Sequence, residues 1–295
     1  MVQVSTPVIE MPRQHWHGAA PDGAEAGAMA AIESGAVLFF PRLSFDLLPE
    51  EHRFLSDGWS DGKSKNISFD TANGRIKGAA GTQGELEALG RMIGRYAASA
   101  RNLIAALFPS YEHVVVERTS FRPFGAEERE TSWRKDDRLL HIDAFPSRPN
   151  RGARILRVFH NANRFGEPRV WCIGEPFAHV AARFLPALPA PLPGTAALLS
   201  MLGVTKGMRS RYDHLMLRLH DRMKSDADYQ RNAPRTQLAF PAGSTWVCFS
   251  DQVSHAVVRG RFLLEQTLKL PVAAMREPDR APIRVLERLA ERALA

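Results

Sequence analysis

The chain reads Phe-Pro-Ala-Gly-Ser-Thr-Trp-Val-Cys-Phe-Ser-Asp-Gln-Val-Ser-His from residue 240 to residue 255, and Arg-Phe-Leu-Leu-Glu-Gln-Thr-Leu-Lys-Leu from 261 to 270. Pro-Ala-Gly is a turn sequence, and the β-branched and aromatic residues at 245–249 predict a strand after it. A short polar loop then ends at His255, and residues 262–270 predict a further strand. This segment is typical of antiparallel β-structure that holds a histidine beside a tight loop.

The remaining elements suggest an α+β protein with a mainly β core. Further strands are predicted at 36–40, 114–121, 154–159 and 168–173, a loop region or hairpin at 60–84, and helices at 85–108, 176–184, 212–224 and 282–293. The pattern shows no alternation of strands and helices, and neither GxGxxG nor GxxxxGK[ST] occurs, so nucleotide-binding α/β folds are poorly supported. An antiparallel barrel or sandwich with helices packed on it fits best.

The composition is that of a globular protein. The 295 residues are 44% apolar, which excludes disordered and fibrous classes. Only Cys172 and Cys248 are present, so no disulfide framework or Cys-based zinc cluster can form. We expect neither a signal peptide nor a membrane span, because no basic and apolar leader and no run of ~18 apolar residues occurs.

The net charge of +7 comes from 39 Lys and Arg against 32 Asp and Glu. Arginine predominates, and its guanidinium group binds carboxylates and phosphates with two parallel hydrogen bonds. A GC-rich genome, which encodes arginine often, explains the excess equally well. The charge alone therefore fits an anionic partner without identifying one.

His141 and Asp143 form the His-x-Asp triplet of the chain. On a strand, residues two apart point to one face, so the imidazole and the carboxylate can bind the same metal ion. A distant histidine would complete the 2-His-1-carboxylate set of non-haem Fe(II) oxygenases. The triplet alone is a weak signal, since about one is expected by chance in a chain of this composition.

The segment that ends at His255 strengthens this interpretation. A strand, a short loop, a histidine and a further strand resemble the closing hairpin of the double-stranded β-helix (jelly-roll, cupin-like) iron/2-oxoglutarate dioxygenases. This resemblance implies a double-stranded β-helix core, metal ligands His141, Asp143 and His255, and the use of Fe(II), 2-oxoglutarate and O2. The ordinary alternative is two unrelated histidines and a loop carboxylate.

Motifs along most of the chain resemble the Kdo hydroxylases, which hydroxylate C3 of 3-deoxy-D-manno-oct-2-ulosonic acid (Kdo) in lipopolysaccharide to give the sugar Ko. The motifs are Lys-Asn-Ile-Ser-Phe (65–69), Glu-Arg-Thr-Ser-Phe-Arg-Pro (117–123), His-Ile-Asp-Ala-Phe-Pro-Ser-Arg-Pro (141–149), Arg-Ile-Leu-Arg-Val-Phe (154–159), Gly-Glu-Pro-Arg-Val-Trp (166–171), Tyr-Gln-Arg-Asn (229–232) and Pro-Ile-Arg-Val-Leu-Glu-Arg-Leu (282–289). The resemblance implies Kdo-lipid A, a lipopolysaccharide precursor, as the acceptor.

2-Oxoglutarate needs a cation for its far carboxylate. Many relatives place an arginine ten to fourteen residues after the second histidine, but residues 265–269 here read Glu-Gln-Thr-Leu-Lys. Strand alternation groups Gln266 with the apolar residues at 262, 264, 268 and 270, which predicts that it points inward. We expect Arg157 to bind the carboxylate, Gln266 to assist and Arg154 to be the alternate; an outward, solvated Arg157 is the competing interpretation.

The acceptor would be a sugar acid on a phosphorylated lipid. Arginines near the quoted motifs could bind its carboxylates or phosphates, and aromatic side chains could pack on its sugar faces. These candidates are Arg118, Arg122, Arg148, Arg151, Arg231, Phe145 and Tyr229. Each taken singly also fits a structural or solvated role. Arg284, Arg288 and Arg292 are spaced four apart, but intrahelical ion pairs explain them better than a lipid-facing stripe.

We expect residues 1–295 to form a single catalytic domain, with a helix-rich part at 1–110, the β-helix core at 111–275 and a C-terminal helix at 276–295. The expected location is the cytoplasm of a Gram-negative bacterium, with peripheral contact to the inner membrane and no nucleic-acid partner. The alternatives are a dioxygenase that acts on a protein or small molecule, a non-enzymatic cupin-like binding module, and, on the basic charge alone, a nucleic-acid demethylase.

Overall fold

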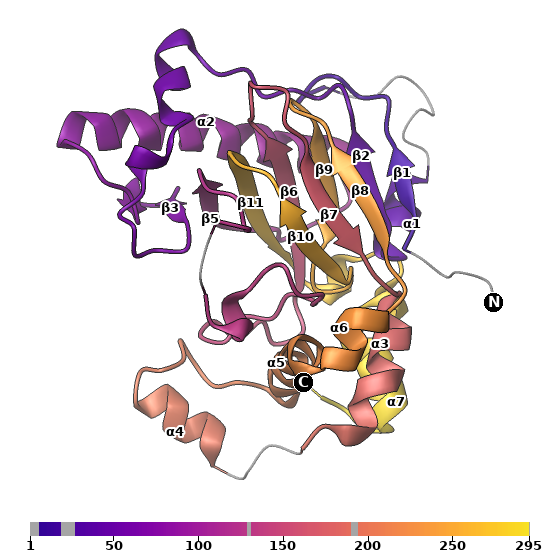
Figure 1. Cartoon of the computed structure of the whole chain (residues 1–295). Helices are drawn as coiled ribbons and strands as arrows, with labels where there is room; N and C mark the ends of the chain where they lie inside the picture. The colour runs from indigo at the N-terminus through magenta and orange to yellow at the C-terminus, as the bar shows by residue number, and fades with distance from the viewer. Residues whose placement is uncertain (1–5, 19–26, 129–130, 190–193, 295) are drawn as a thin grey trace.

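The computed structural model describes residues 6–18, 27–128, 131–189 and 194–294, and its centre is a large β-sheet (Figure 1). The strands of this sheet follow the order β1-β2-β9-β6-β11-β5-β3-β4. Neighbours are antiparallel except β1 and β2, which are parallel. The bounds are β1 (Val8–Glu10), β2 (Val37–Phe40), β3 (Ile67–Asp70), β4 (Arg75–Lys77), β5 (Val115–Arg122), β6 (Arg154–Asn161), β9 (Thr245–Phe249) and β11 (Leu263–Leu270).

A second sheet of three antiparallel strands lies against one face of the first. Its order is β10-β7-β8, with β7 (Arg169–Ile173), β8 (Thr236–Phe240) and β10 (His255–Arg259). Aromatic rings fill the space between the sheets: Trp246 of β9 stacks on Phe240 at 4.1 Å between ring centroids and meets Trp171 edge to face. This interior holds the sheets face to face, as in a β-sandwich.

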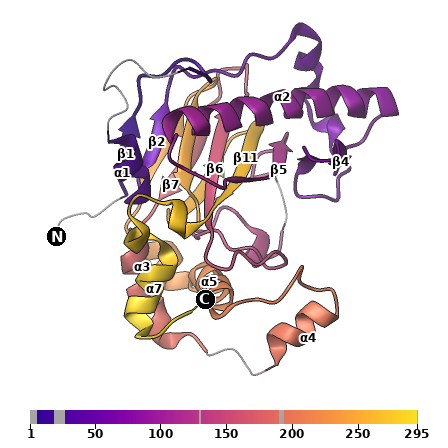
Figure 2. The same ribbon diagram turned by 180° about the vertical axis from the view of Figure 1, so that it is seen from behind.

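Helix α2 (Gln83–Leu107) covers the opposite face of the large sheet (Figure 2). It begins at a capping box, in which the Thr82 backbone N–H donates to the Glu85 carboxylate at 2.8 Å, and it ends just before Pro109. The buried Tyr96 hydroxyl donates to the Val158 carbonyl of β6 at 2.8 Å. The central strands are therefore buried on both faces.

The other helices gather mainly at one end of the two sheets (Figure 1). Helices α3, α5, α6 and α7 lie close together there, α1 lies beside β1 and β2, and α4 stands apart from the rest (Figures 1 and 2). Their bounds are α1 (Ala28–Glu33), α3 (Phe177–Phe184), α4 (Thr195–Met201), α5 (Arg211–Ser225), α6 (Ala227–Asn232) and α7 (Pro282–Ala290). No helix among the described residues is both long and apolar enough to cross a membrane.

The predicted mixed architecture is confirmed, and each strand and helix predicted by range is present with its ends shifted by at most three residues. Strands β1, β8 and β10 were not predicted. The strand spacing considered for His141 and Asp143 does not apply, because His141 makes a single β-bridge and residues 142–145 form no strand. The hairpin considered at 60–84 is present as β3 and β4.

Candidate active site

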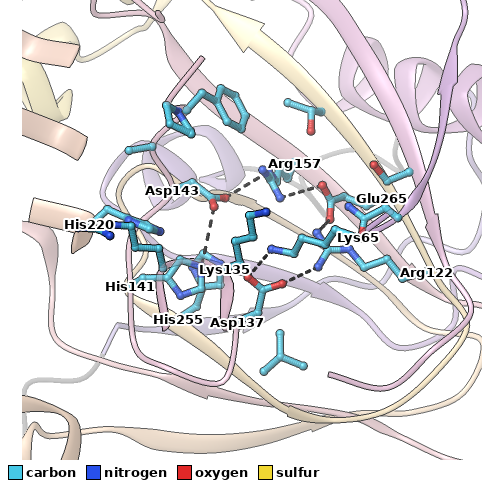
Figure 3. A pocket seen from close by; sticks show the side chains of 18 of the residues that line it. Lys65, Arg122, Lys135, Asp137, His141, Asp143, Arg157, His220, His255 and Glu265 are labelled. Carbon is cyan, nitrogen blue, oxygen red and sulfur yellow. Dashed lines mark hydrogen bonds and ion pairs between the residues drawn. The ribbon is translucent and has the colours of Figure 1, made fainter. Parts of the chain in front are cut away.

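Two histidines that are far apart in sequence are held together by their backbones. The His141 N–H donates to the His255 carbonyl at 3.0 Å, and the His255 N–H donates back to the His141 carbonyl at 2.8 Å. Both side chains are almost fully buried, and their rings lie 4.6 Å apart between centroids (Figure 3). The backbone pairing therefore fixes both imidazoles on one side of the site.

The orientation of each ring is set by a carbonyl of its own chain segment. Nδ1 of His141 lies 2.7 Å from the Leu139 carbonyl, and Nδ1 of His255 lies 2.8 Å from the Val253 carbonyl. A carbonyl can only accept, so each Nδ1 carries the proton and each Nε2 presents a lone pair. Burial lowers the pKa of both rings and keeps them neutral, which is the form that binds metals.

Asp143 brings its carboxylate to the same point. Its N–H donates to the Ser250 carbonyl at 2.8 Å, and its Oδ1 lies 3.9 Å from Nε2 of His141. Burial by itself would raise the pKa of this carboxyl. The Arg157 guanidinium, 3.2 Å away, acts together with His255, His141 and Ser250, and their combined effect places the pKa well below its usual value. The carboxylate is therefore ionised and ready to bind a cation.

The three side chains meet the geometric requirement of a metal site. One ligand atom from each of His141, Asp143 and His255 can be chosen so that all three lie within 4.8 Å of one another. Two neutral imidazoles and a carboxylate on one side of an ion form the facial set of non-haem Fe(II) oxygenases, which leaves positions free for other ligands. The donor set therefore fits iron.

Contacts from neighbouring residues hold two of these ligands in place. The Gln230 side chain of α6 accepts from the Leu140 N–H at 2.9 Å and donates to the Leu140 carbonyl at 3.0 Å, which fixes the residue before His141. The Trp171 indole of β7 stacks on the His255 ring at 5.0 Å between centroids. Such outer contacts orient metal ligands and commonly affect metal affinity as strongly as a weak ligand does.

A chain of alternating charges leads from Asp143 into the space between the sheets (Figure 3). Asp143 pairs with Arg157, which donates to Glu265 at 2.8 Å. Glu265 pairs with Arg122 at 2.6 Å, and Arg122 pairs with Asp137 at 2.9 Å; the chain ends where Asp137 meets Lys65 at 2.7 Å. Buried charges of this kind persist only when paired, so the network fixes the positions of its members.

The three ligands open into a cavity of about 690 Å³. Its lining includes more cations than anions among the described residues, so it is suited to anionic ligands. The cations are Lys65, Arg118, Arg122, Arg134, Lys135, Arg148, Arg157, Arg169 and Lys224, and the acids are Glu117, Asp137, Asp143, Asp221 and Glu265.

The structure brings several of the predicted site residues to this cavity. The predicted metal ligands line it together with Arg157, which points inward rather than into solvent. The predicted substrate residues that line it are Arg118, Arg122, Phe145 and Arg148.

The structure does not bring two of the residues predicted for 2-oxoglutarate, Gln266 and Arg154, to the cavity lining. Gln266 lies on the face of β11 that points away from the cavity, and its side chain accepts from the Thr119 hydroxyl at 2.6 Å. Both faces of β11 are buried, and the face with the polar residues is the one that lines the cavity. Arg154 is fully buried against Asp251 at 2.9 Å and lies outside the cavity lining.

Three predicted substrate residues also lie outside the cavity lining. Tyr229 is buried in the helical core, edge to face with Phe184. Arg231 is exposed on α6, and Arg151 is exposed in the loop before β6. These residues are close in sequence to the quoted motifs, but α6 and the loop before β6 turn their side chains away from the site.

Arg169 of β7 lines the cavity, although no sequence pattern singled it out. It is 1% exposed, its Nη1 donates to the Gly260 carbonyl, and its Nε has no partner. No carboxylate of the described residues forms an ion pair with it, and burial lowers its pKa to about 10, so it still carries a charge at neutral pH. Arg169 stands two residues before Trp171, on the same face of the strand.

Further cavity residues come from α5 and from the 3-10 turn Trp133–Lys135 between β5 and β6. His220, Lys224 and Lys135 line the cavity, and the His220 ring meets the His141 ring edge to face at 5.5 Å. A helical pattern alone does not indicate which polar face of α5 meets a cavity. These residues were therefore missed.

The two sheets and this ligand set define a metal-dependent oxygenase. Residues 15–293 match the family of 3-deoxy-D-manno-oct-2-ulosonic acid (Kdo) hydroxylases, and the chain belongs to that family. A comparison with curated proteins found no match.

Solved structures of a Kdo hydroxylase, KdoO, resemble the chain over nearly its whole length. The complex of KdoO with α-ketoglutarate and Fe(III) is 46% identical, with 98% of each chain covered and a TM-score of 0.94. The cobalt(II) complex gives 46% identity, coverage of 98% of this chain and 97% of that one, and a TM-score of 0.95. KdoO is described there as a non-haem Fe(II) α-ketoglutarate-dependent dioxygenase.

Proposed function

We propose that the protein hydroxylates C3 of Kdo in Kdo-lipid A to give Ko, with Fe(II), 2-oxoglutarate and O2. The observation that carries this proposal is the convergence of His141, Asp143 and His255 at one end of a cationic cavity. Membership of the Kdo hydroxylase family supplies the sugar. The acceptor is a membrane lipid, so the enzyme would work at the cytoplasmic face of the inner membrane, without a nucleic-acid partner.

The core is proposed to be a double-stranded β-helix within one catalytic domain. The two facing sheets, with the three buried ligands lining the cavity, support this description. Helix α2 belongs to the same unit, because its Tyr96 hydroxyl is bonded into β6. The β-helix core and the N-terminal part are expected to unfold together.

His141, Asp143 and His255 would hold the iron. When bound there, Fe(II) supplies the activation of O2 that is coupled to the oxidative decarboxylation of 2-oxoglutarate. The chain itself contributes neutral imidazoles with fixed Nε2 lone pairs, an ionised carboxylate held by Arg157, and walls that exclude bulk water from the reacting C–H bond.

Arg169 is the better candidate for the far carboxylate of 2-oxoglutarate. The Arg157 charge is shared between Asp143 and Glu265, whereas Arg169 is buried and has no carboxylate partner among the described residues. A buried cation without an ion pair is costly unless an anion arrives with the ligand. Arg157 then remains the second candidate, and its first role is to hold Asp143.

Cations at the mouth of the cavity are proposed to bind the acidic acceptor. Arg118, Lys135 and Arg148 line the cavity and are partly or fully exposed, whereas Lys224 of the same lining is buried. Arg118 and Arg148 already contact Asp70 and Glu117, but these pairs are partly exposed and can exchange for a ligand. Phe145, beside Arg157, offers an aromatic face for the sugar.

The direct test is to incubate the purified protein with Fe(II), 2-oxoglutarate, O2 and Kdo-lipid A, and to analyse the lipid by mass spectrometry. We expect the Kdo unit to gain one oxygen atom and an equal amount of succinate to form. Turnover of 2-oxoglutarate with a peptide or a free metabolite, but none with Kdo-lipid A, would contradict the acceptor and retain the chemistry. Failure to bind iron at all would favour a non-enzymatic binding module.

A further inference from the structure

Residues 195–208, which we call the docking arm, expose apolar side chains to an unusual degree. The arm consists of α4 and the turn that follows it. Its exposed large apolar residues are Leu198, Met201, Leu202, Val204 and Met208, and they are 52%, 80%, 66%, 54% and 55% exposed. No residue of α4 is buried. Figures 1 and 2 show the helix standing away from the rest of the molecule.

This exposure needs a partner. Burying one leucine or methionine side chain is worth about 1.5–3 kcal/mol, so several such side chains left in water on one segment mark an interaction surface. The other exposed apolar residues, such as Val115 and Phe165, are scattered over separate elements and need no explanation.

The arm and the stretch of sequence on either side of it carry charges of one sign. The sequence contains no Asp or Glu between Glu175 and Asp213, while Lys206 lies among the apolar residues and Arg209 and Arg211 come just after them. Lys206 is exposed beside the apolar turn. Apolar side chains bordered by cations are the composition that binds the surface of an anionic bilayer.

The arm is tied to the wall of the candidate active site. The Lys206 N–H donates to the Ser147 carbonyl at 2.8 Å, and the Arg209 guanidinium donates to the Pro146 carbonyl. Pro146 and Ser147 line the cavity, next to Arg148. A surface that holds the arm would therefore lie beside the cavity mouth.

We propose that the docking arm binds an anionic phospholipid membrane, with its apolar side chains in the interfacial region, and so presents the cavity to a lipid-linked acceptor. This proposal rests on the proposed function, because only an enzyme with a lipid-linked acceptor needs to dock on a membrane. The binding of the arm to lipid can nevertheless be measured without turnover. A second copy of the chain is a poorer occupant, because it would bring two cationic segments together.

The test compares the full-length protein with the variant Leu198→Ser/Met201→Ser/Leu202→Ser in co-sedimentation with vesicles of phosphatidylethanolamine and phosphatidylglycerol. All three side chains are exposed, so the fold should not change. We expect the variant to bind at least about tenfold more weakly. Binding should also fall with added salt and be weak on vesicles of phosphatidylcholine alone.

A matched control replaces exposed apolar residues elsewhere, as Val115→Ser/Phe165→Ser. This control should bind vesicles like the unaltered protein. Both variants should keep full turnover of Kdo-lipid A in detergent micelles. If neither the variants nor the unaltered protein turn over Kdo-lipid A, the proposed function is contradicted, but the comparison of vesicle binding still tests the docking proposal. Equal vesicle binding by the arm variant and the unaltered protein overturns the docking proposal. If the unaltered protein does not bind vesicles but forms a dimer, and the arm variant is a monomer, the docking proposal is overturned in favour of self-association.

Discussion

His141, Asp143 and His255 each present one ligand atom to a common point, and this arrangement makes a first prediction. The variants His141→Ala and Asp143→Ala should lose at least about a hundredfold in affinity for Fe(II) and lose turnover, because the loss of outer contacts alone costs ten- to a hundredfold. Isothermal titration with Mn(II) under anaerobic conditions measures the affinity. The exposed His179→Ala serves as the control and should bind the metal normally. Retention of turnover in both ligand variants would contradict the assignment.

A second prediction separates Arg169 from Arg157. Arg169→Met should raise the KM for 2-oxoglutarate by about ten- to a hundredfold, as expected for one lost hydrogen-bonded charge, and leave metal affinity nearly unchanged. Arg157→Met should weaken metal binding first, since Asp143 then loses its partner.

The two readouts are the KM for 2-oxoglutarate and the Kd for Mn(II), with Arg169→Lys as the conservative comparison. If Arg169→Met leaves the KM unchanged while Arg157→Met raises it, Arg157 is the carboxylate partner and the assignment to Arg169 is wrong.

At this scale the sequence predicted the ligand triad as a group, since the residue types and the hairpin around His255 are distinctive. It did not single out Arg169, and it placed Tyr229 and Arg231 at the site. The function of an arginine depends on what surrounds it: Arg169 is buried without a carboxylate, whereas Arg231 is solvated. A sequence shows the residue and not these surroundings.

Among the elements, β6 is joined to the loop after β9 by the Arg154–Asp251 pair, which is almost completely buried. Burial raises the pKa of Asp251 even beside its partner. Arg154→Leu should therefore destabilise the protein by about 3–5 kcal/mol, because it leaves a buried carboxylate uncompensated.

Chemical denaturation measures that loss. The double variant Arg154→Leu/Asp251→Leu should recover part of it, and Arg284→Ala should cost less than about 1 kcal/mol, because its pair with Glu287 is exposed. A single variant as stable as the unaltered protein would show that the pair does not hold these elements.

Strand β11 illustrates why element prediction succeeded while its orientation failed. The residues Leu263–Leu270 are typical of a strand, and the strand is present. Alternation then favoured the even-numbered residues as the inner face. Both faces of β11 are buried. The even-numbered residues pack on the side of α2, and the odd-numbered residues line the cavity, so polarity alone could not show which face meets the cavity.

For the whole molecule, the cavity combines side chains from the β3 region, β5, the loop before β6, β6, β7, α5, β10 and β11. No sequence pattern predicts that so many separate segments converge. Family resemblance suggested the cofactors, but the cationic lining and the exposed docking arm come only from the folded chain.

Ligand binding should stabilise the whole chain. Mn(II) with 2-oxoglutarate, each at about 100 times its Kd, should raise the unfolding free energy by about 2.7 kcal/mol per ligand and the melting temperature by roughly 5 °C or more. The shift should vanish in Asp143→Ala, because that variant cannot hold the metal. Thermal unfolding followed by calorimetry, with 2-oxoglutarate alone as the control, measures it.

A crystal structure with Mn(II) and 2-oxoglutarate provides the most direct test of the central claim. The account predicts one metal ion at bonding distance from Nε2 of His141, Nε2 of His255 and a carboxylate oxygen of Asp143, with the keto acid on the same ion and its far carboxylate at Arg169. An ion bound elsewhere, or a metal that lacks any of the three ligands, would contradict it.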